Sequence, residues 1–158
     1  MKLARAIHFD DSDTRVYSNS ARTGEWCVSG GFEFSNWSEA DLDGKAKQAF
    51  SNGWFGLETS GRVTFVAVAK VTSQEVSQLE ELLANHFVTY YGAPSTELAL
   101  PVASAELQAM GDLCDEHDDN TLLVVSRELT EAGVKETFRI IDPEDAGLDQ
   151  FAIHGSLD

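Results

Sequence analysis

The most regular hydrophobic pattern in the chain predicts an amphipathic helix over Ser73–Tyr91. At its start, Thr72 and Glu75 have the spacing of a capping box. Gly92 and Pro94 predict its end, because glycine adopts the left-handed cap conformation and proline cannot continue a helix. Side chains that recur every three or four residues place one stripe on the core side: Val76, Leu79, Leu83, His86, Phe87 and Tyr90.

Two further helices are predicted, one on each side of this segment. The first covers Glu39–Phe50, with Ser38 as its N-cap and Gly53 beyond its end. The second covers Ser95–Asp115. We expect it to kink or break near Pro101, because proline lacks the N–H that an interior helical position donates.

Alternating and continuous apolar runs predict the strands. Trp26–Phe34 alternates apolar with polar residues, which predicts one wet face, and Gly30-Gly31 inside it predicts a bulge. Val63–Val71 and Leu122–Val125 are apolar on both faces and are therefore expected at the centre of the sheet. The other expected strands are Leu3–Phe9, Arg15–Ser18, Trp54–Glu58 and Val134–Ile140, the last paired with Leu122–Leu129 through a hairpin turn at Thr130–Gly133.

The order of these elements predicts the fold class. Strands often follow one another directly, so we expect a single α+β domain with a mostly antiparallel sheet of about six strands and two to three helices. The domain is predicted to span 1–142. Residues 143–158 are expected to form an acidic C-terminal tail that lies along the body through Leu148, Phe151 and Ile153.

Comparing the width of the helices with the width of the sheet suggests that helices do not cover all of one sheet face. Helices are about 10 Å wide and strands lie about 4.8 Å apart, so two helices cover roughly four strands on one face. The remaining face would then be covered by the tail or by a second subunit, which predicts a homodimer as one arrangement.

Charge narrows the classes of partner. The 158 residues contain 27 Asp and Glu against 11 Lys and Arg, a formal net charge of −16. Such a field repels phosphate backbones and anionic lipid, so we expect no nucleic-acid and no membrane binding. It favours a basic protein partner or serves solubility alone. Two cysteines and no signal-like or membrane-length apolar run predict a cytoplasmic protein.

The densest polar cluster, around Cys114, His117 and Asp118, has two interpretations. Cys114 and His117 lie three residues apart, so on a helix they share a face, and thiolate with imidazole suits a zinc-like ion. Alternatively, Cys114 ends the apolar face of a helix, and Asp118 belongs to the turn that follows. We prefer the second interpretation and predict neither a metal nor a cofactor.

Two other features have structural explanations that we prefer. His8, Asp10, Asp11 and Asp13 alternate like calcium ligands, but the glycine and closing glutamate of an EF-hand are missing, so a turn is expected. Arg5 shares a strand face with apolar residues and is expected to reach the sheet edge.

His86, Tyr90 and Trp54 are the candidate ligand-binding residues. They would line a pocket between the sheet and the helices, although His86 also fits a hydrogen-bonded core position and both aromatic side chains fit the core. Nucleotide, zinc-protease and serine-hydrolase motifs are missing, so no catalytic residue is predicted.

Several stretches together resemble a family of short acidic bacterial proteins of unknown function. They are Lys2–Thr14, Gly24–Phe32, Gly44–Phe50, Gly92–Pro94 and Leu113–Asp115. The resemblance implies no activity, cofactor or catalytic residue. We therefore expect a non-enzymatic accessory or protein-interaction domain. The alternative is a small-molecule-binding domain or a cryptic enzyme with a pocket between sheet and helices.

Overall fold

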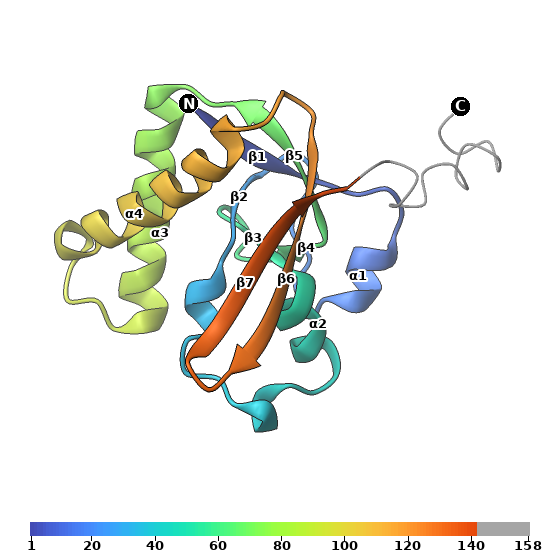
Figure 1. Cartoon of the computed structure of the whole chain (residues 1–158). Helices are drawn as coiled ribbons and strands as arrows, with labels where there is room; N and C mark the ends of the chain where they lie inside the picture. Colours follow the sequence, from blue (N-terminus) through green and yellow to red (C-terminus); the bar gives the residue numbers. More distant parts are fainter. Residues whose placement is uncertain (142–158) are drawn as a thin grey trace, which may run out of the picture.

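A computed structural model describes residues 1–141, which form seven strands and four α-helices (Figure 1). The strands are β1 (Lys2–Ile7), β2 (Trp26–Val28), β3 (Trp54–Gly56), β4 (Arg62–Val63), β5 (Phe65–Lys70), β6 (Leu122–Thr130) and β7 (Gly133–Ile140). The helices are α1 (Ser12–Val16), α2 (Gly44–Asn52), α3 (Ser73–Tyr91) and α4 (Thr96–Asp115), with short 3₁₀ turns η1 (Gly31–Phe34) and η2 (Glu39–Asp41). The tail predicted at 143–158 lies outside the described residues.

The seven strands form one sheet in the order β4-β3-β2-β1-β5-β6-β7, and every pair of neighbouring strands is antiparallel. This confirms the predicted α+β class and the antiparallel sheet, with one strand and one helix more than expected. The predicted hairpin is also confirmed, since Thr130 pairs with Gly133 across a two-residue turn between β6 and β7.

The sheet is curled, so its two ends approach each other across the core. Trp54 of β3 stacks on Phe138 of β7 with ring centroids 5.6 Å apart, although four strands lie between β3 and β7 in the sheet order. The side-chain amide of Asn52, at the end of α2, donates to the Val125 carbonyl of β6 at 3.0 Å. The sheet therefore covers part of its own inner face, which removes much of the uncovered surface that flat-sheet counting predicted.

The two long helices form a layer at one side of the sheet (Figure 1). The capping box of α3 is confirmed: the Glu75 N–H donates to the Thr72 hydroxyl at 3.1 Å, and the Thr72 N–H donates to the Glu75 carboxylate at 3.0 Å. Gly92 ends α3 in the left-handed conformation. α4 runs unbroken through Pro101, contrary to prediction, because its missing N–H affects only the exposed carbonyl of Glu97 in the first turn. None of the helices in residues 1–141 is long and apolar enough to cross a membrane.

The predicted strand Trp26–Phe34 is wrong beyond Val28. Gly30 has a φ of 76°, which ends the strand, and the chain continues as η1. A Cβ at Gly30 would lie 2.3 Å from the Cβ of Phe55, so both the backbone conformation and the close approach require glycine. The expected wet face is also wrong, because the side chains on both sides of β2 are buried.

Three other boundaries differ from prediction. Arg15–Ser18 was expected to be a strand, but its first two residues belong to α1; Asp10 accepts the Ser12 N–H at 2.8 Å and turns the chain into the helix. Thr64 divides the predicted strand Val63–Val71, because β4 pairs with β3 whereas β5 pairs with β1. The predicted helix at Glu39–Phe50 is divided into η2 and α2, and the capping box of Ser38 with Asp41 begins η2 rather than the α-helix.

Candidate functional site

Two buried arginines link strands near the two ends of the curled sheet. Arg62 of β4 and Arg127 of β6 are 4% and 6% exposed. Both donate to the Gly53 carbonyl, at 3.0 Å and 2.8 Å, and both contact the Ser29 carbonyl. The end of α2 and the loop after β2 are thereby tied to two strands that lie far apart in the sheet.

Arg127 caps the C-terminus of α2. Its guanidinium donates at 3.0 Å to the carbonyl of Phe50, one of the last carbonyls of the helix. It also donates at 3.3 Å to the Ala49 carbonyl, which accepts the Gly53 N–H as well. A cation there also stabilises the negative end of the helix dipole. Burial, with the nearby charge of Arg62, lowers the pKa of Arg127 to about 10, so it remains a cation at neutral pH. Glu136 of β7 accepts from its Nε at 2.7 Å.

Arg62 fixes the position of η1. It donates to the Gly30 carbonyl at 3.0 Å and to one carboxylate oxygen of Glu33 at 2.9 Å. Its guanidinium carbon also lies 4.7 Å from the ring centroid of Phe34. The short turn η1 therefore presents Glu33 beside Arg62 while Phe32, on its other side, packs against α3.

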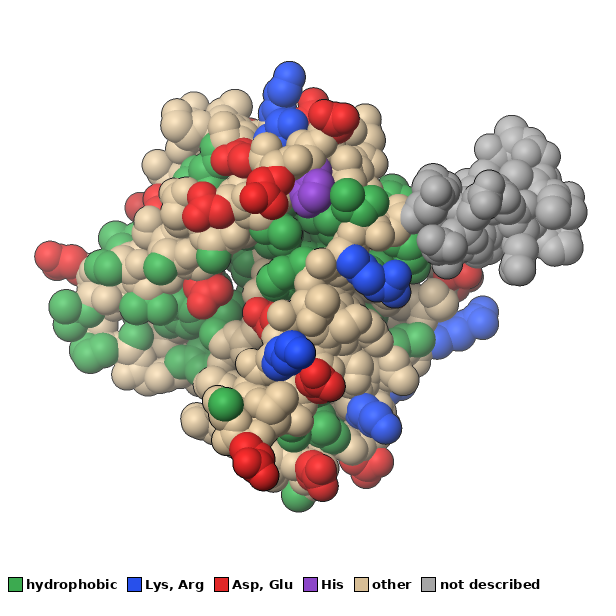
Figure 2. All heavy atoms as spheres, in the orientation of Figure 1, with side chains coloured by type: hydrophobic (Ala, Val, Ile, Leu, Met, Phe, Trp, Pro, Cys, Tyr) green, Lys and Arg blue, Asp and Glu red, His purple; other side chains and the backbone are tan. Residues whose placement is uncertain are grey.

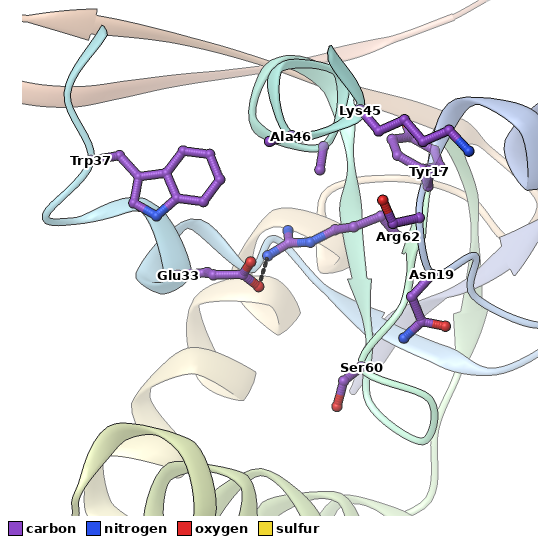
Figure 3. A pocket seen from close by; sticks show the side chains of 10 residues that line it. Tyr17, Asn19, Glu33, Trp37, Lys45, Ala46, Ser60 and Arg62 are labelled. Atoms are coloured by element: carbon purple, nitrogen blue, oxygen red, sulfur yellow. Dashed lines mark hydrogen bonds and ion pairs between the residues drawn. The ribbon is translucent and has the colours of Figure 1, made fainter. Parts of the chain in front are cut away.

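A polar pocket of about 210 Å³ opens over Arg62 (Figure 3). Its walls come from the end of α1, from η1, from α2 and from the turn between β3 and β4. Figure 3 shows Trp37 at the left of the pocket, Lys45 extending past Tyr17 and away from Glu33, and the Glu33 carboxylate turned toward Arg62. Burial raises the pKa of Tyr17 to about 12, and its hydroxyl lies 2.8 Å from that of Thr64.

A second hollow, with a volume of about 360 Å³, is almost entirely apolar. It lies where α3 ends and α4 begins, and we call it the α3–α4 groove. It is lined mainly by Phe32, Phe87, Tyr91, Pro94, Leu98 and Val102. Leu98 and Val102 are 64% and 54% exposed, because they lie one turn apart on the side of α4 that faces away from the core.

The two helices that form the α3–α4 groove carry charges of one sign only. No Lys or Arg occurs between Val71 and Ser126. The two helices themselves carry seven acidic residues: Glu75, Glu80, Glu81, Glu97, Glu106, Asp112 and Asp115. Figure 2 shows hydrophobic side chains gathered over the junction of α3 and α4 at the left, with acidic but no basic side chains beside them.

His86 and Tyr90, two of the predicted ligand-binding residues, meet beside this groove, with ring centroids 4.8 Å apart. His86 is half-buried, and its Nδ1 lies 3.2 Å from the Ser60 hydroxyl, which borders the pocket over Arg62. Burial lowers the pKa of His86. Trp54 is not brought to them: it is fully buried against Phe138, and its indole N–H has no partner among the described residues.

The predicted metal candidates do not converge. Cys114 is buried in the core side of α4, where burial raises the pKa of its thiol to about 12. The nearby acidic residues engage Lys2 instead, whose backbone N–H donates to Asp115 at 2.7 Å and whose ammonium group donates to the His117 carbonyl at 2.7 Å. Asp118 is exposed. Within residues 1–141, no three His, Cys, Asp or Glu side chains are grouped to hold a metal ion.

The second acidic cluster has a packing role. Asp13 is buried and lies 3.1 Å from the ring Nδ1 of His8, and it accepts from the Thr64 hydroxyl at 2.9 Å. Asp10 and Asp11 turn the chain into α1.

Arg5 lies on the inner strand β1, and its side chain extends to the surface, where it is 43% exposed. Its guanidinium stacks 3.8 Å from the ring centroid of Trp26 and lies 3.9 Å from the Glu75 carboxylate.

Sequence patterns missed the residues that organise both hollows. Arg62 directly precedes an apolar strand and Arg127 interrupts one, and a lone arginine at an inward strand position is the only signal that either carried. Glu33 and Lys45 gave no signal, since charged residues in loops and short helices are ordinary surface residues.

The fold and the two hollows define a single-domain α+β protein with an apolar groove beside a polar pocket. A family model described as "Family of unknown function (DUF6505)" matches residues 1–158, so the chain belongs to that family. This confirms the resemblance to a family of unknown function. No curated protein and no solved structure matches the chain.

Proposed function

We propose that this protein is an interaction domain whose α3–α4 groove binds a basic amphipathic segment of a partner protein. The observation that carries the proposal is an exposed apolar hollow in a helical layer without a single Lys or Arg. Contiguous apolar surface of this kind commonly marks an interaction site. The surrounding acidic residues favour a partner that carries positive charge around its apolar side chains.

The groove has the form expected for a helical or extended ligand segment. Leu98 and Val102 rise from α4 on one side, and Tyr91 closes the other side from the end of α3. The aromatic ring of Phe32 packs edge-on against Tyr91, with centroids 5.9 Å apart. Aromatic side chains clustered with aliphatic ones at the centre of a hollow are typical of the positions that contribute most to binding free energy at protein interfaces.

A second copy of this chain is a weaker candidate for the same groove. Each copy would bring a formal charge of −16 and the same acidic helical layer to the interface. A homodimer would therefore need salt to screen the repulsion, and its affinity would rise with ionic strength. A basic partner gives the opposite dependence, because salt screens an attraction.

The test uses fluorescence anisotropy with a labelled amphipathic helical peptide of Leu and Lys. We expect it to bind, and a scrambled peptide of the same composition and one with Glu in place of Lys to bind much more weakly. The double change Leu98→Ala and Val102→Ala should weaken binding by about tenfold or more, since central apolar anchors typically contribute over 1 kcal/mol each. Leu82→Ala, an exposed leucine of α3 that does not line the groove, is the matched control.

Three results would contradict the proposal. Equal binding of the scrambled peptide would mean attraction by charge alone. Unchanged affinity in the double variant would place binding elsewhere. Sedimentation velocity showing a dimer that tightens with salt and dissociates in the double variant would assign the groove to a second copy of the chain.

A further inference from the structure

We infer that the α3–α4 groove continues into an acidic slot between α4 and β7, and that this slot takes an arginine side chain of the basic partner segment. The acidic slot is the hollow that Glu106 of α4 and Glu136 of β7 line together. The inference rests on the function proposed for the groove, because the arginine belongs to the segment whose apolar side chains enter the groove.

Three hollows adjoin one another along α4. Phe32 lines both the α3–α4 groove and a neighbouring hollow of about 370 Å³. Ser29, Glu106 and Glu136 line that neighbouring hollow and also a smaller one of about 140 Å³. The three therefore form a trough that begins between α3 and α4 and ends between α4 and β7. Figure 2 shows acidic side chains beside the hollowed surface between α4 and the β6–β7 hairpin.

The residues of α4 that line this trough share one side of the helix. Five of them recur every three or four positions: Leu98, Val102, Glu106, Ala109 and Leu113. At a rise of about 1.5 Å per residue, they extend over roughly 22 Å. Glu106 follows Val102 by one turn. A partner helix that runs along α4 with an apolar side chain at Val102 therefore has a side chain one turn further on that reaches Glu106.

Glu136 presents a fixed carboxylate with one free oxygen. Its Oε2 accepts from Arg127 Nε at 2.7 Å. A Cβ at Gly31 would lie 2.5 Å from the same oxygen, so the carboxylate lies directly over this glycine. Its Oε1 accepts no hydrogen bond from the described residues. A positioned carboxylate with an open acceptor suits a cationic donor.

Glu106 supplies a second carboxylate that has no cation of its own. Within residues 1–141 its side chain makes no hydrogen bond or ion pair, although it is partly buried. Burial and the charge of Glu136 raise the pKa of Glu106, which places the two carboxylates close enough to repel each other. A cation that entered the slot would offset this repulsion and pair the carboxylate that burial penalises.

The lining of the acidic slot favours arginine over lysine. A guanidinium has five N–H donors in one plane and can donate to two carboxylates at once, whereas an ammonium is a compact point charge. Phe32, at the boundary with the groove, offers an aromatic ring on which a guanidinium can stack. Within residues 1–141, no third His, Cys, Asp or Glu joins the two carboxylates to hold a metal ion.

Fluorescence anisotropy tests the slot with pairs of helical peptides that share one leucine face. In each pair, the position one turn beyond the last leucine is arginine in one peptide and neutral citrulline in the other. One pair carries it at the N-terminal end and one at the C-terminal end, which covers both directions of binding. At one of the two ends, arginine should bind about tenfold or more tightly than citrulline, as expected for a hydrogen bond to a charged group. Lysine at that position should bind less tightly than arginine.

Glu106→Gln should abolish the preference for arginine, and Glu97→Gln should keep it. Glu97 is the matched control, because it is exposed, lies nine positions before Glu106 on the opposite side of α4, and loses the same charge. Glu106→Gln removes one of two like charges from the hollow, so it should not destabilise the fold. Circular dichroism of both variants then separates a binding role from a structural one.

Equal binding of the arginine and citrulline peptides at both ends, or equal effects of Glu106→Gln and Glu97→Gln, would overturn the slot and leave the proposed groove intact. Lysine that bound as tightly as arginine would overturn the choice of arginine. If no peptide binds, ethylguanidinium tests the slot alone by amide NMR spectroscopy of the full chain. Shifts at the residues that line the slot, lost in Glu106→Gln and kept in Leu98→Ala, would support the slot without the groove. No shift at these residues would overturn it.

Discussion

Replacing Arg127 tests whether the buried arginines stabilise the fold mainly through carbonyls or through ion pairs. Arg127→Met removes donors to four main-chain carbonyls and to the Glu136 carboxylate. Glu136→Gln removes the negative charge and keeps an oxygen that can accept from the arginine Nε. The two variants therefore separate the cap of α2 from the ion pair.

The structure predicts a clear asymmetry between them. Arg127→Met removes the donor of the Phe50 carbonyl, removes one of two donors from the carbonyls of Ala49, Gly53 and Ser29, and leaves the Glu136 carboxylate without its counter-charge. Together these losses should cost about 3–5 kcal/mol of unfolding free energy. Glu136→Gln should cost only about 1–2 kcal/mol, because the arginine keeps its carbonyl partners and Glu136 is partly exposed. Arg127→Lys should fall between them, since lysine keeps the charge but cannot reach several carbonyls with one planar group.

Urea unfolding followed by far-ultraviolet circular dichroism measures these differences. A total stability of about 5–15 kcal/mol is usual for a domain, so the methionine variant should unfold at much lower urea concentration or fail to fold. If the methionine variant does not fold, Arg127→Lys is compared with Glu136→Gln instead. Equal losses for Arg127→Lys and Glu136→Gln, or a loss below about 1 kcal/mol for Arg127→Met, would refute the capping role.

Two further predictions concern stability. Leu83→Ala should cost about 2–5 kcal/mol, because Leu83 is 1% exposed, whereas Leu82→Ala at a 42% exposed position should change stability by less than about 0.5 kcal/mol; similar urea midpoints would contradict the packing of α3. Burial, with the charge of Glu136, raises the pKa of Glu106 above 4.5, so the folded state holds this proton to higher pH than the unfolded chain and loses stability as pH rises through the raised pKa. Glu106→Gln should therefore melt above the wild type at neutral pH and together with it well below pH 4.5, and the opposite order would contradict the assignment.

The elements that the sequence predicts correctly depend on contacts within a few residues. The bounds of α3 follow from Thr72, Glu75 and Gly92, whose hydrogen bonds and backbone angle act inside one helical turn. The β6–β7 hairpin follows from a two-residue turn between an apolar strand and one that alternates apolar with polar residues. Such interactions join residues that are close in sequence, so the sequence pattern predicts them whatever the tertiary structure is.

The elements that the sequence predicts wrongly depend on contacts between residues far apart in the chain. Trp26–Phe34 alternates like a strand, yet it ends early because Gly30 must pass between Phe55 and Arg62. Likewise, counting helices over a flat sheet predicted an uncovered face, but the curl brings Trp54 against Phe138. The curvature of the sheet is the sum of small rotations between neighbouring strands, over seven strands. The residue pattern of a single strand therefore does not predict it.

The candidate sites show the same division. Sequence alone determined that the region from Val71 to Ser126 has no basic residue, and that His86 and Tyr90 share a helix face. Only the tertiary structure put Phe32 beside Tyr91 to form a groove, and brought Glu33, Arg62 and Lys45 to the lining of one pocket. Each site forms where segments that are distant in sequence lie side by side. Which segments come together depends on which of their side chains can be buried and hydrogen-bonded at the same time. That is a property of the whole packed structure, and no local sequence pattern records it.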